Sequence, residues 1–217
     1  MQYESLIFDI DGTLWDSRAL IAEEYNIQLA KEGLPHLSVS AETFRSLFGK
    51  VNEEIADTIF PTVPKSERYD LMQRCMEAGD RRLQEDECRI GYPGVRETLE
   101  ALSKNHRLFI VSNSQKGYPE LCMEKLGLGA YICGHLCYGE TGTSKGTSIR
   151  TLMKMHDIQN CAYIGDTQMD YEATQEAGVP FIWAAYGFGT PENYVRKIDS
   201  IKELLDLPEV SANTEEK

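Results

Sequence analysis

Residues 5–17 read Ser-Leu-Ile-Phe-Asp-Ile-Asp-Gly-Thr-Leu-Trp-Asp-Ser and place two carboxylates, Asp9 and Asp11, at the end of an apolar run. The run is typical of a buried strand, and a carboxylate after it is unfavourable unless a metal, a cation or a substrate compensates its charge. Side chains two positions apart in an extended chain point the same way. We therefore expect Asp9 and Asp11 to converge on one reacting group, as nucleophile and proton shuttle, before Gly12 turns the chain. The alternative is an ordinary strand followed by an Asp-Gly turn.

The composition is that of an ordinary soluble globular protein. Of the 217 residues, 41% are hydrophobic and 26% are charged, and this length suits one large domain or a medium domain with a small one inserted. The formal net charge of −13 argues against nucleic acid or an anionic membrane surface as the partner, because both require a surplus of Lys and Arg. An anionic small substrate would need a local positive site.

The cysteines and the N-terminus indicate the compartment. The six cysteines form no Cys-x-x-Cys pair and lack the density of a disulfide-rich secreted domain, so we expect reduced thiols. Cys133, His135 and Cys137 lie on a predicted strand without the ligand spacing of a zinc site. There is no basic segment of a signal peptide at the N-terminus and no apolar run as long as a membrane span. We therefore expect a cytoplasmic protein.

Strands and helices alternate regularly beyond residue 90. Helical spacing of apolar residues separates short apolar runs, and such alternation predicts an α/β fold with a Rossmann-like, doubly wound parallel sheet and helices on both faces. The runs that predict strands lie at 108–111, 131–138, 161–164 and 180–184.

The strand pattern disappears between residues 16 and 88, where apolar residues recur at helical spacing. We predict an inserted all-helical cap domain at 16–88, a catalytic core formed by 1–15 and 89–210, and a C-terminal tail at 211–217. The cap is expected to lie over the active face as a lid.

Polar side chains follow three of the predicted strands. Ligands of open α/β sheets bind outside the carboxyl ends of the strands, so these residues are expected to meet at one edge. Lys145, at the start of a predicted helix, is the expected local cation at the same edge. The residues at the strand ends are Asp9, Asp11, Ser112, Asn113 and Asp166.

These motifs resemble the four signatures of the haloacid dehalogenase superfamily of phosphatases. The matching residues are Asp9-Ile10-Asp11-Gly12-Thr13, Ser112, Lys145 and Gly165-Asp166-Thr167-Gln168-Met169-Asp170, in the same order and with similar spacing. The helical insertion resembles the cap of the subgroup that includes phosphoglycolate phosphatase, so the resemblance covers essentially the whole chain. It implies a phosphatase that uses Mg²⁺ and forms a covalent aspartyl-phosphate.

The resemblance also implies a role for each residue. Asp9 would attack phosphorus, while Asp11 would protonate the leaving oxygen and then activate water. Magnesium prefers oxygen ligands, which Asp9, the backbone carbonyl of Asp11 and Asp166 would supply. Asp170 would be a further ligand or a partner of the ligands. The transferring phosphoryl group would be bound by Gly12, Ser112, the amide of Asn113 and Lys145.

Substrate selection is expected to involve the insertion. Arg45 and Lys50 flank a predicted helix end, where caps of this subgroup present a specificity residue. Either could bind a second anionic group, such as a carboxylate on the leaving alcohol, or be a solvated surface cation. Trp15 replaces the smaller aliphatic residue usual in this motif and is expected at the cap hinge or the pocket. The predicted partner is a small phosphorylated metabolite, with a phosphoglycolate-like ester as the leading candidate.

Three alternatives stay open. A sugar phosphomutase would use the same aspartyl-phosphate, but the Gly12-Thr13 pair resembles the phosphatases. A dehalogenase would lack the second aspartate, Asp11. A non-catalytic protein that binds a phosphorylated ligand through Lys145 and Ser112 would not need all the expected reacting residues, which are present. The sequence sets neither the physiological substrate nor the oligomeric state.

Overall fold

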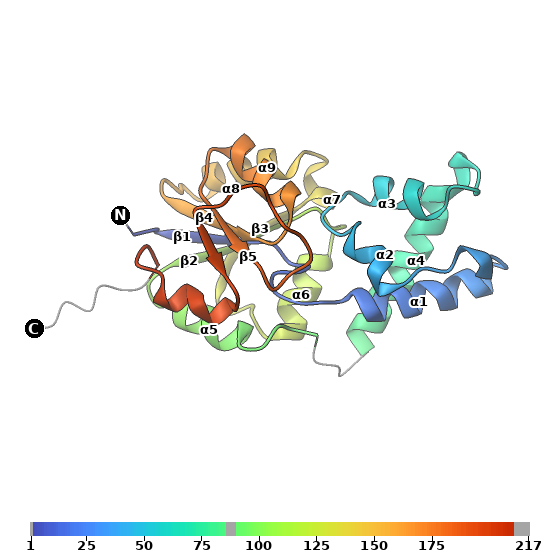
Figure 1. Ribbon diagram of the computed structural model, residues 1–217, viewed down its shortest axis with the longest axis horizontal. Helices are drawn as coiled ribbons and strands as arrows, with labels where there is room; N and C mark the ends of the chain where they lie inside the picture. The colour runs from blue at the N-terminus through green and yellow to red at the C-terminus, as the bar shows by residue number, and fades with distance from the viewer. Residues whose placement is uncertain (1, 86–89, 211–217) are drawn as a thin grey trace, which may run out of the picture. The chain divides into compact units, whose positions relative to one another are not determined.

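The computed structural model describes residues 2–85 and 90–210 (Figure 1). The chain divides into two compact units, one formed by residues 1–15 and 91–217 and the other by residues 16–90. The predicted boundary at residues 88 and 89 and the predicted tail at 211–217 lie outside the described residues.

The larger unit is built on a six-stranded sheet with the order β3-β2-β1-β4-β5-β6, in which all neighbouring strands run parallel. This confirms the predicted fold. The three-residue strand β6 was not predicted, because only its last residue, Ile198, is buried. The strands are β1 (Ser5–Phe8), β2 (Arg107–Ser112), β3 (Ile132–Cys137), β4 (Cys161–Gly165), β5 (Phe181–Ala184) and β6 (Arg196–Ile198).

Helices cover both faces of this sheet, with α8 and α9 on one face and α5 on the other (Figure 1). The segment after β3 contains the one-turn helix α7, which a capping box between Cys137 and Glu140 stabilises. The helices of this unit are α5 (Val95–Leu102), α6 (Tyr118–Leu126), α7 (Tyr138–Thr141), α8 (Lys145–Met155), α9 (Gln168–Ala177) and the 3-10 helix η2 (Ile201–Asp206).

The centre of the sheet forms a rigid platform for the strand ends. Ile7 of β1, Phe109 of β2 and Tyr163 of β4 are fully buried and pack in one cluster with residues of α8 and α9. Burying a side chain of this size stabilises a fold by roughly 1.5–3 kcal/mol. In this register Phe8 pairs with Ile110 on one side and Ile164 on the other, so the carboxyl ends of β1, β2 and β4 lie next to one another.

The smaller unit, described over residues 16–85 and 90, consists of helices joined by turns and loops, and no strand lies within these residues. Its helices α1 and α4 approach closely at Gly79, where an added Cβ would lie 2.8 Å from Cδ1 of Ile21. Across residues 2–85 and 90–210, no helix combines the length and the apolar character that a membrane span needs. The helices are α1 (Arg18–Lys31), the 3-10 helix η1 (Pro35–Leu37), α2 (Ala41–Arg45), α3 (Asn52–Ile59) and α4 (Lys65–Glu85).

Candidate active site

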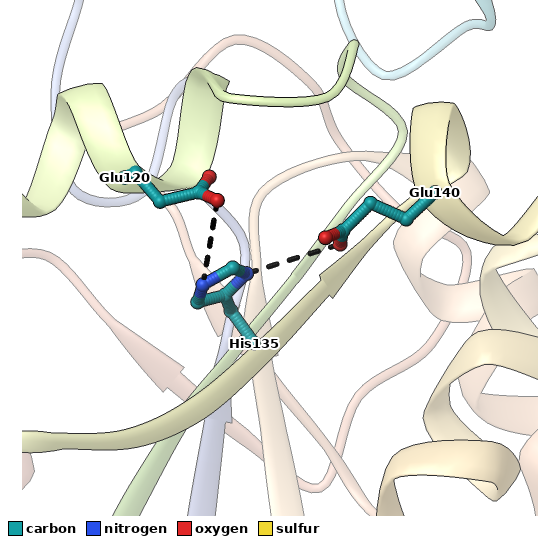
Figure 2. A group of neighbouring side chains, drawn as sticks. All are labelled: Glu120, His135 and Glu140. Carbon is teal, nitrogen blue, oxygen red and sulfur yellow. Dashed lines mark ion pairs between the residues drawn. The ribbon is translucent and has the colours of Figure 1, made fainter.

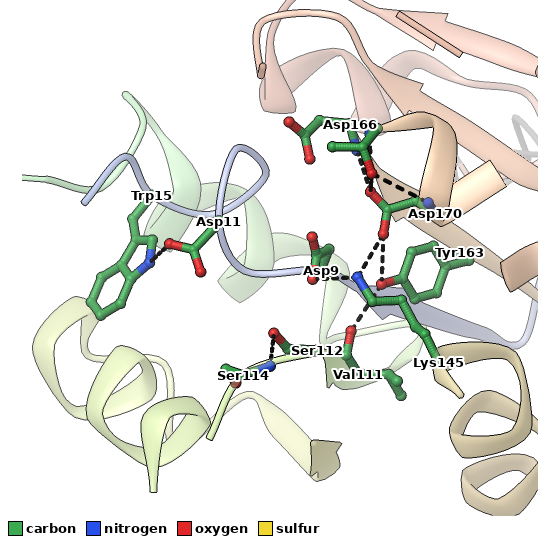
Figure 3. A network of polar contacts seen from close by, with 11 residues as sticks. Asp9, Asp11, Trp15, Val111, Ser112, Ser114, Lys145, Tyr163, Asp166 and Asp170 are labelled. Atoms are coloured by element: carbon green, nitrogen blue, oxygen red, sulfur yellow. Dashed lines mark hydrogen bonds and ion pairs between the residues drawn. The ribbon is translucent and has the colours of Figure 1, made fainter. Parts of the chain in front are cut away.

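Four buried charged side chains meet at the carboxyl edge of the sheet (Figure 3). Asp9 directly follows β1 and Asp166 directly follows β4, while Lys145 and Asp170 lie in the first turns of α8 and α9. None of the four is more than 5% exposed. The structure therefore brings together four of the residues that the sequence placed at this edge.

Lys145 bridges two of the carboxylates. Its Nζ donates to Oδ1 of Asp170 at 2.7 Å and to Oδ1 of Asp9 at 3.0 Å. Burial lowers the pKa of Lys145, but the charges of Asp170 and Asp9 outweigh burial and hold that pKa above its ordinary value. Lys145 is therefore a permanently charged ammonium group beside the predicted nucleophile.

The carboxylate of Asp170 accepts several hydrogen bonds. Its Oδ2 accepts from the hydroxyl of Thr167 at 2.7 Å, from the amide of Thr167 at 2.9 Å and from the amide of Asp166 at 3.2 Å. Burial alone would raise the pKa of Asp170, but Lys145 and these donors hold it below its ordinary value. Asp170 is thus an ionised carboxylate that anchors Lys145.

Asp166 differs from Asp170 in its surroundings. Its Oδ2 accepts from the amide of Phe188 at 2.7 Å, whereas its Oδ1 is buried and has no hydrogen-bond partner in the described part of the chain. Burial and the neighbouring charges of Asp170 and Asp9 raise the pKa of Asp166 well above its ordinary value. A buried carboxylate oxygen without a donor is unfavourable unless something else compensates it.

The carboxylates of this cluster fit a divalent metal ion. Asp9, Asp166 and Asp170 each offer an oxygen, and these oxygens lie within 4.8 Å of one another. Burial raises the pKa of Asp9 to about 7 despite Lys145, so the protein alone does not fully compensate the three carboxylates. A hard cation with oxygen ligands would supply the missing charge and a partner for Oδ1 of Asp166.

Gly12 allows the chain to pass close to Asp166. Its φ of +82° is in the left-handed region, and an added Cβ would lie 2.1 Å from Oδ2 of Asp166. No other residue fits this position without displacing the carboxylate. The predicted turn at Gly12 is therefore present, and its part in phosphate binding stays a prediction.

The sequence predicts that the extended chain continues through Asp11, but the structure shows that it does not. Strand β1 ends at Phe8, and the carbonyl of Ile10 accepts from the amides of Thr13 and Leu14, so a turn begins before Asp11. The Asp11 carboxylate lies beside the indole of Trp15 rather than beside Lys145 (Figure 3). The negative charge of Asp11 is nevertheless among those that raise the pKa of Asp9, so the convergence of the two carboxylates on one reacting group stays a prediction.

The other predicted binding residues fall in two places. Ser112 ends β2 at the same edge, is buried, and its Oγ accepts from the amide of Ser114; Asn113 follows it. Arg45 and Lys50 belong to the helical unit. Arg45 lies 3.9 Å from Glu42 in an ion pair between exposed side chains, and such pairs contribute little to stability.

Sequence reasoning missed several groups that hold the site together. The hydroxyl of Tyr163 donates to the carbonyl of Val111 at 2.8 Å and lies 3.4 Å from Oδ1 of Asp170. The bond from Thr167 to Asp170 could have been found, because Thr-x-x-Asp before a helix is a capping pattern. The amide of Phe188 could not, since a backbone group carries no sequence signal.

A second group of possible ligands contains Glu120, His135 and Glu140 (Figure 2). Nε2 of His135 lies 3.8 Å from Glu120, and Nδ1 lies 3.9 Å from Glu140. The two carboxylates therefore face different nitrogens of one ring. Oε2 of Glu140 also accepts from the amide of Cys137 at 3.1 Å. This geometry suits an imidazole that bridges two helices better than a metal held in common.

The sequence that carries this site matches a known protein family. The model of the haloacid dehalogenase-like hydrolases matches residues 6–184, which contain every charged residue of the site. The chain belongs to this family. The match confirms the resemblance drawn from the motifs.

Individual relatives agree with this assignment. The phosphoglycolate phosphatase of Agrobacterium fabrum is 29% identical, over 84% of this chain and 80% of its own length. Pyrophosphatase PpaX of Oceanobacillus iheyensis is 23% identical, over 95% of this chain and 97% of its own. A haloacid dehalogenase-like hydrolase from Streptococcus pneumoniae has the same fold, with a TM-score of 0.80 at 21% identity over 94% of this chain and 97% of its own. The family match and the phosphoglycolate phosphatase relatives confirm the predicted class, a phosphoric monoester hydrolase.

Proposed function

We propose that this hydrolase is a Mg²⁺-dependent phosphatase that cleaves a small phosphomonoester through an aspartyl-phosphate on Asp9. The observation that carries the proposal is the bridge from Lys145 to Asp9 and Asp170 next to the unpartnered Oδ1 of Asp166. A phosphate ester is dianionic, so a carboxylate can attack it only where positive charge cancels the repulsion. This edge of the sheet offers the ammonium group of Lys145 and, in Asp9 and Asp166, two carboxylates suited to a cation.

Magnesium would be held by Asp9, the carbonyl of Asp11 and Asp166. When bound, the ion would offset negative charge on the phosphoryl oxygens. Asp170 fits an indirect role better than direct ligation, because its Oδ2 already accepts three hydrogen bonds and its Oδ1 accepts one from Lys145. We therefore assign it to the positioning of Lys145.

The reaction would proceed in two steps. The Asp9 carboxylate attacks phosphorus and the bond to the leaving oxygen breaks, while Asp11 gives its proton to that oxygen. Water then attacks the aspartyl-phosphate, Asp11 takes up a proton from the water, and phosphate and the Asp9 carboxylate are released. Lys145, Ser112 and the amide of Asn113 would hold the phosphoryl oxygens.

Hydrolysis of a broad panel of phosphomonoesters tests this proposal. Purified protein with Mg²⁺ is expected to release phosphate, and chelation or the substitution Asp9→Asn is expected to abolish the release. Activity that survives Asp9→Asn would overturn the proposed nucleophile. The panel includes phosphoglycolate, sugar phosphates, nucleotides and pyrophosphate, because similar relatives carry names for different substrates.

A phosphoglycolate-like ester is our proposed substrate class, processed in the cytoplasm. The name of one relative and the two cations Arg45 and Lys50 support it, since a carboxylate on the leaving alcohol would need a cationic partner. Arg45→Ala and Lys50→Ala are expected to raise KM for phosphoglycolate more than KM for p-nitrophenyl phosphate, which has no carboxylate. Equal increases in KM for both substrates would contradict a role of Arg45 and Lys50 in binding the carboxylate of the substrate.

A further inference from the structure

The carboxylate of Asp11 is held by two aromatic side chains that no motif of the sequence assigns to it. The indole N–H of Trp15 donates to Oδ1 of Asp11 at 3.0 Å, and the hydroxyl of Tyr118 donates to the same oxygen at 2.9 Å. Figure 3 shows the first of these contacts. Two donors on a single oxygen restrict the position and the plane of a carboxylate more than either donor alone.

Both donors are fixed by their own surroundings. Trp15 is fully buried, its backbone forms bridges to Asp11 and to Gly91, and its carbonyl accepts from the amide of Gly12 at 2.9 Å. Tyr118 is 5% exposed and begins α6. The two rings meet edge to face, with centroids 5.3 Å apart and an angle of 76° between their planes. This packing restricts the rotamers of both rings.

We propose that Trp15 and Tyr118 are positioning residues that hold Asp11 so that it delivers its proton from Oδ2. The inference rests on the proposed function of Asp11 as general acid. Because Oδ1 accepts two hydrogen bonds, the proton of the neutral carboxyl group belongs on Oδ2. That proton passes to the leaving oxygen as the phosphorus–oxygen bond breaks, and Oδ1 keeps its two donors throughout.

The dependence of the rate on the leaving group tests this role. Phenolate needs a proton as it leaves, whereas p-nitrophenolate is stable as an anion. Tyr118→Phe and Trp15→Phe are expected to lower kcat/KM for phenyl phosphate by roughly 10- to 100-fold and to leave kcat/KM for p-nitrophenyl phosphate nearly unchanged, because only the first ester needs general acid catalysis. The ratio of kcat/KM for phenyl phosphate to kcat/KM for p-nitrophenyl phosphate reports phosphoryl transfer to Asp9 and not the later hydrolysis of the aspartyl-phosphate. Equal losses on both esters, or none, would overturn the inference.

Matched variants separate positioning from a general loss of packing. Tyr171→Phe and Trp183→Phe make the same chemical changes away from Asp11, where Tyr171 packs on Phe181 and Trp183 on Tyr194. Both should leave the ratio of the two esters unchanged. In an Asp11→Asn background, Tyr118→Phe should have little further effect on phenyl phosphate, since residues that act through one another are not additive. Full additivity would contradict the proposal.

A spectroscopic measurement covers two remaining cases, a Trp15→Phe protein that does not fold and a wild type that is inactive. The indole N–H resonance of Trp15, which remains alone in Trp183→Phe, is expected to shift when Asp11→Asn is added. An unchanged resonance would overturn the contact itself. If the wild type releases no phosphate from any ester, the proposed function itself is rejected. If Asp11→Asn loses activity selectively on phenyl phosphate but Tyr118→Phe does not, only this inference is rejected.

Discussion

The ammonium group of Lys145 lies closer to Oδ1 of Asp170, at 2.7 Å, than to Oδ1 of Asp9, at 3.0 Å. Asp170 is itself fixed by Thr167 and by the amide of Asp166, so the ion pair ties the start of α8 to the start of α9. Lys145 therefore reaches Asp9, the proposed nucleophile, from a position that Asp170 defines. Asp170 can in this way control the position of the positive charge next to Asp9.

Replacing Lys145 by Met is expected to lower kcat/KM at least about 100-fold, because the positive charge beside Asp9 is lost. It should also destabilise the protein by about 3–5 kcal/mol, since breaking a buried ion pair leaves uncompensated charge. Phosphate release and urea unfolding measure the two effects. Lys154→Met, at an exposed position of the same helix, is the control and should change neither. Wild-type activity in Lys145→Met would contradict the mechanism.

Asp166→Asn and Asp170→Asn should separate direct ligation from positioning. Because Oδ1 of Asp166 has no hydrogen-bond partner among residues 2–85 and 90–210, Asp166→Asn is expected to abolish measurable Mg²⁺ binding in titration calorimetry. Asp170→Asn should retain binding, weakened by roughly 10-fold as for other partners of metal ligands. The reverse order of effects would make Asp170 the ligand and would contradict our assignment.

Gly12→Ala is expected to damage metal binding through Asp166. Gly178 is a matched control, because it also has a positive φ, +74°, but an added Cβ there has nothing within 4 Å. Both substitutions should destabilise the protein by about 1–3 kcal/mol through backbone strain. Only Gly12→Ala, whose Cβ would displace the carboxylate, should also weaken Mg²⁺ affinity and activity. Equal metal affinity in the two variants would show that the close approach is not needed.

The residues at the strand ends could be predicted because the ends of parallel strands share one edge, and β1, β2 and β4 are neighbours in the sheet. Asp9, Ser112 and Asp166 are placed by this rule alone. The orientation of Asp11 could not be predicted, because it depends on Tyr118, which is 107 positions away. Contacts of that kind arise from packing between elements, and a single sequence carries no local pattern for them.

The stability of the metal-free protein should fall as the pH rises from about 4 to about 7, because of Asp9. Its pKa is 3.8 in the unfolded reference and about 7 in the folded protein, where burial is the main cause. Between these values the folded protein keeps a proton that the unfolded chain has released, so deprotonation favours unfolding. Urea unfolding in a chelator should therefore have a higher midpoint near pH 5 than near pH 8.

Asp9→Asn tests this contribution, because it removes the carboxyl group of Asp9 together with the charge by which Asp9 raises the pKa of Asp166. The variant should lose the part of the pH slope that Asp9 supplies directly and through the pKa of Asp166, and it should be more stable than the wild type near pH 8. Added Mg²⁺ should stabilise the wild type most at that pH, since a cation binds the ionised carboxylate and lowers its pKa. Identical slopes in wild type and Asp9→Asn would mean that Asp9 is already ionised without metal, and that Lys145 alone compensates its charge.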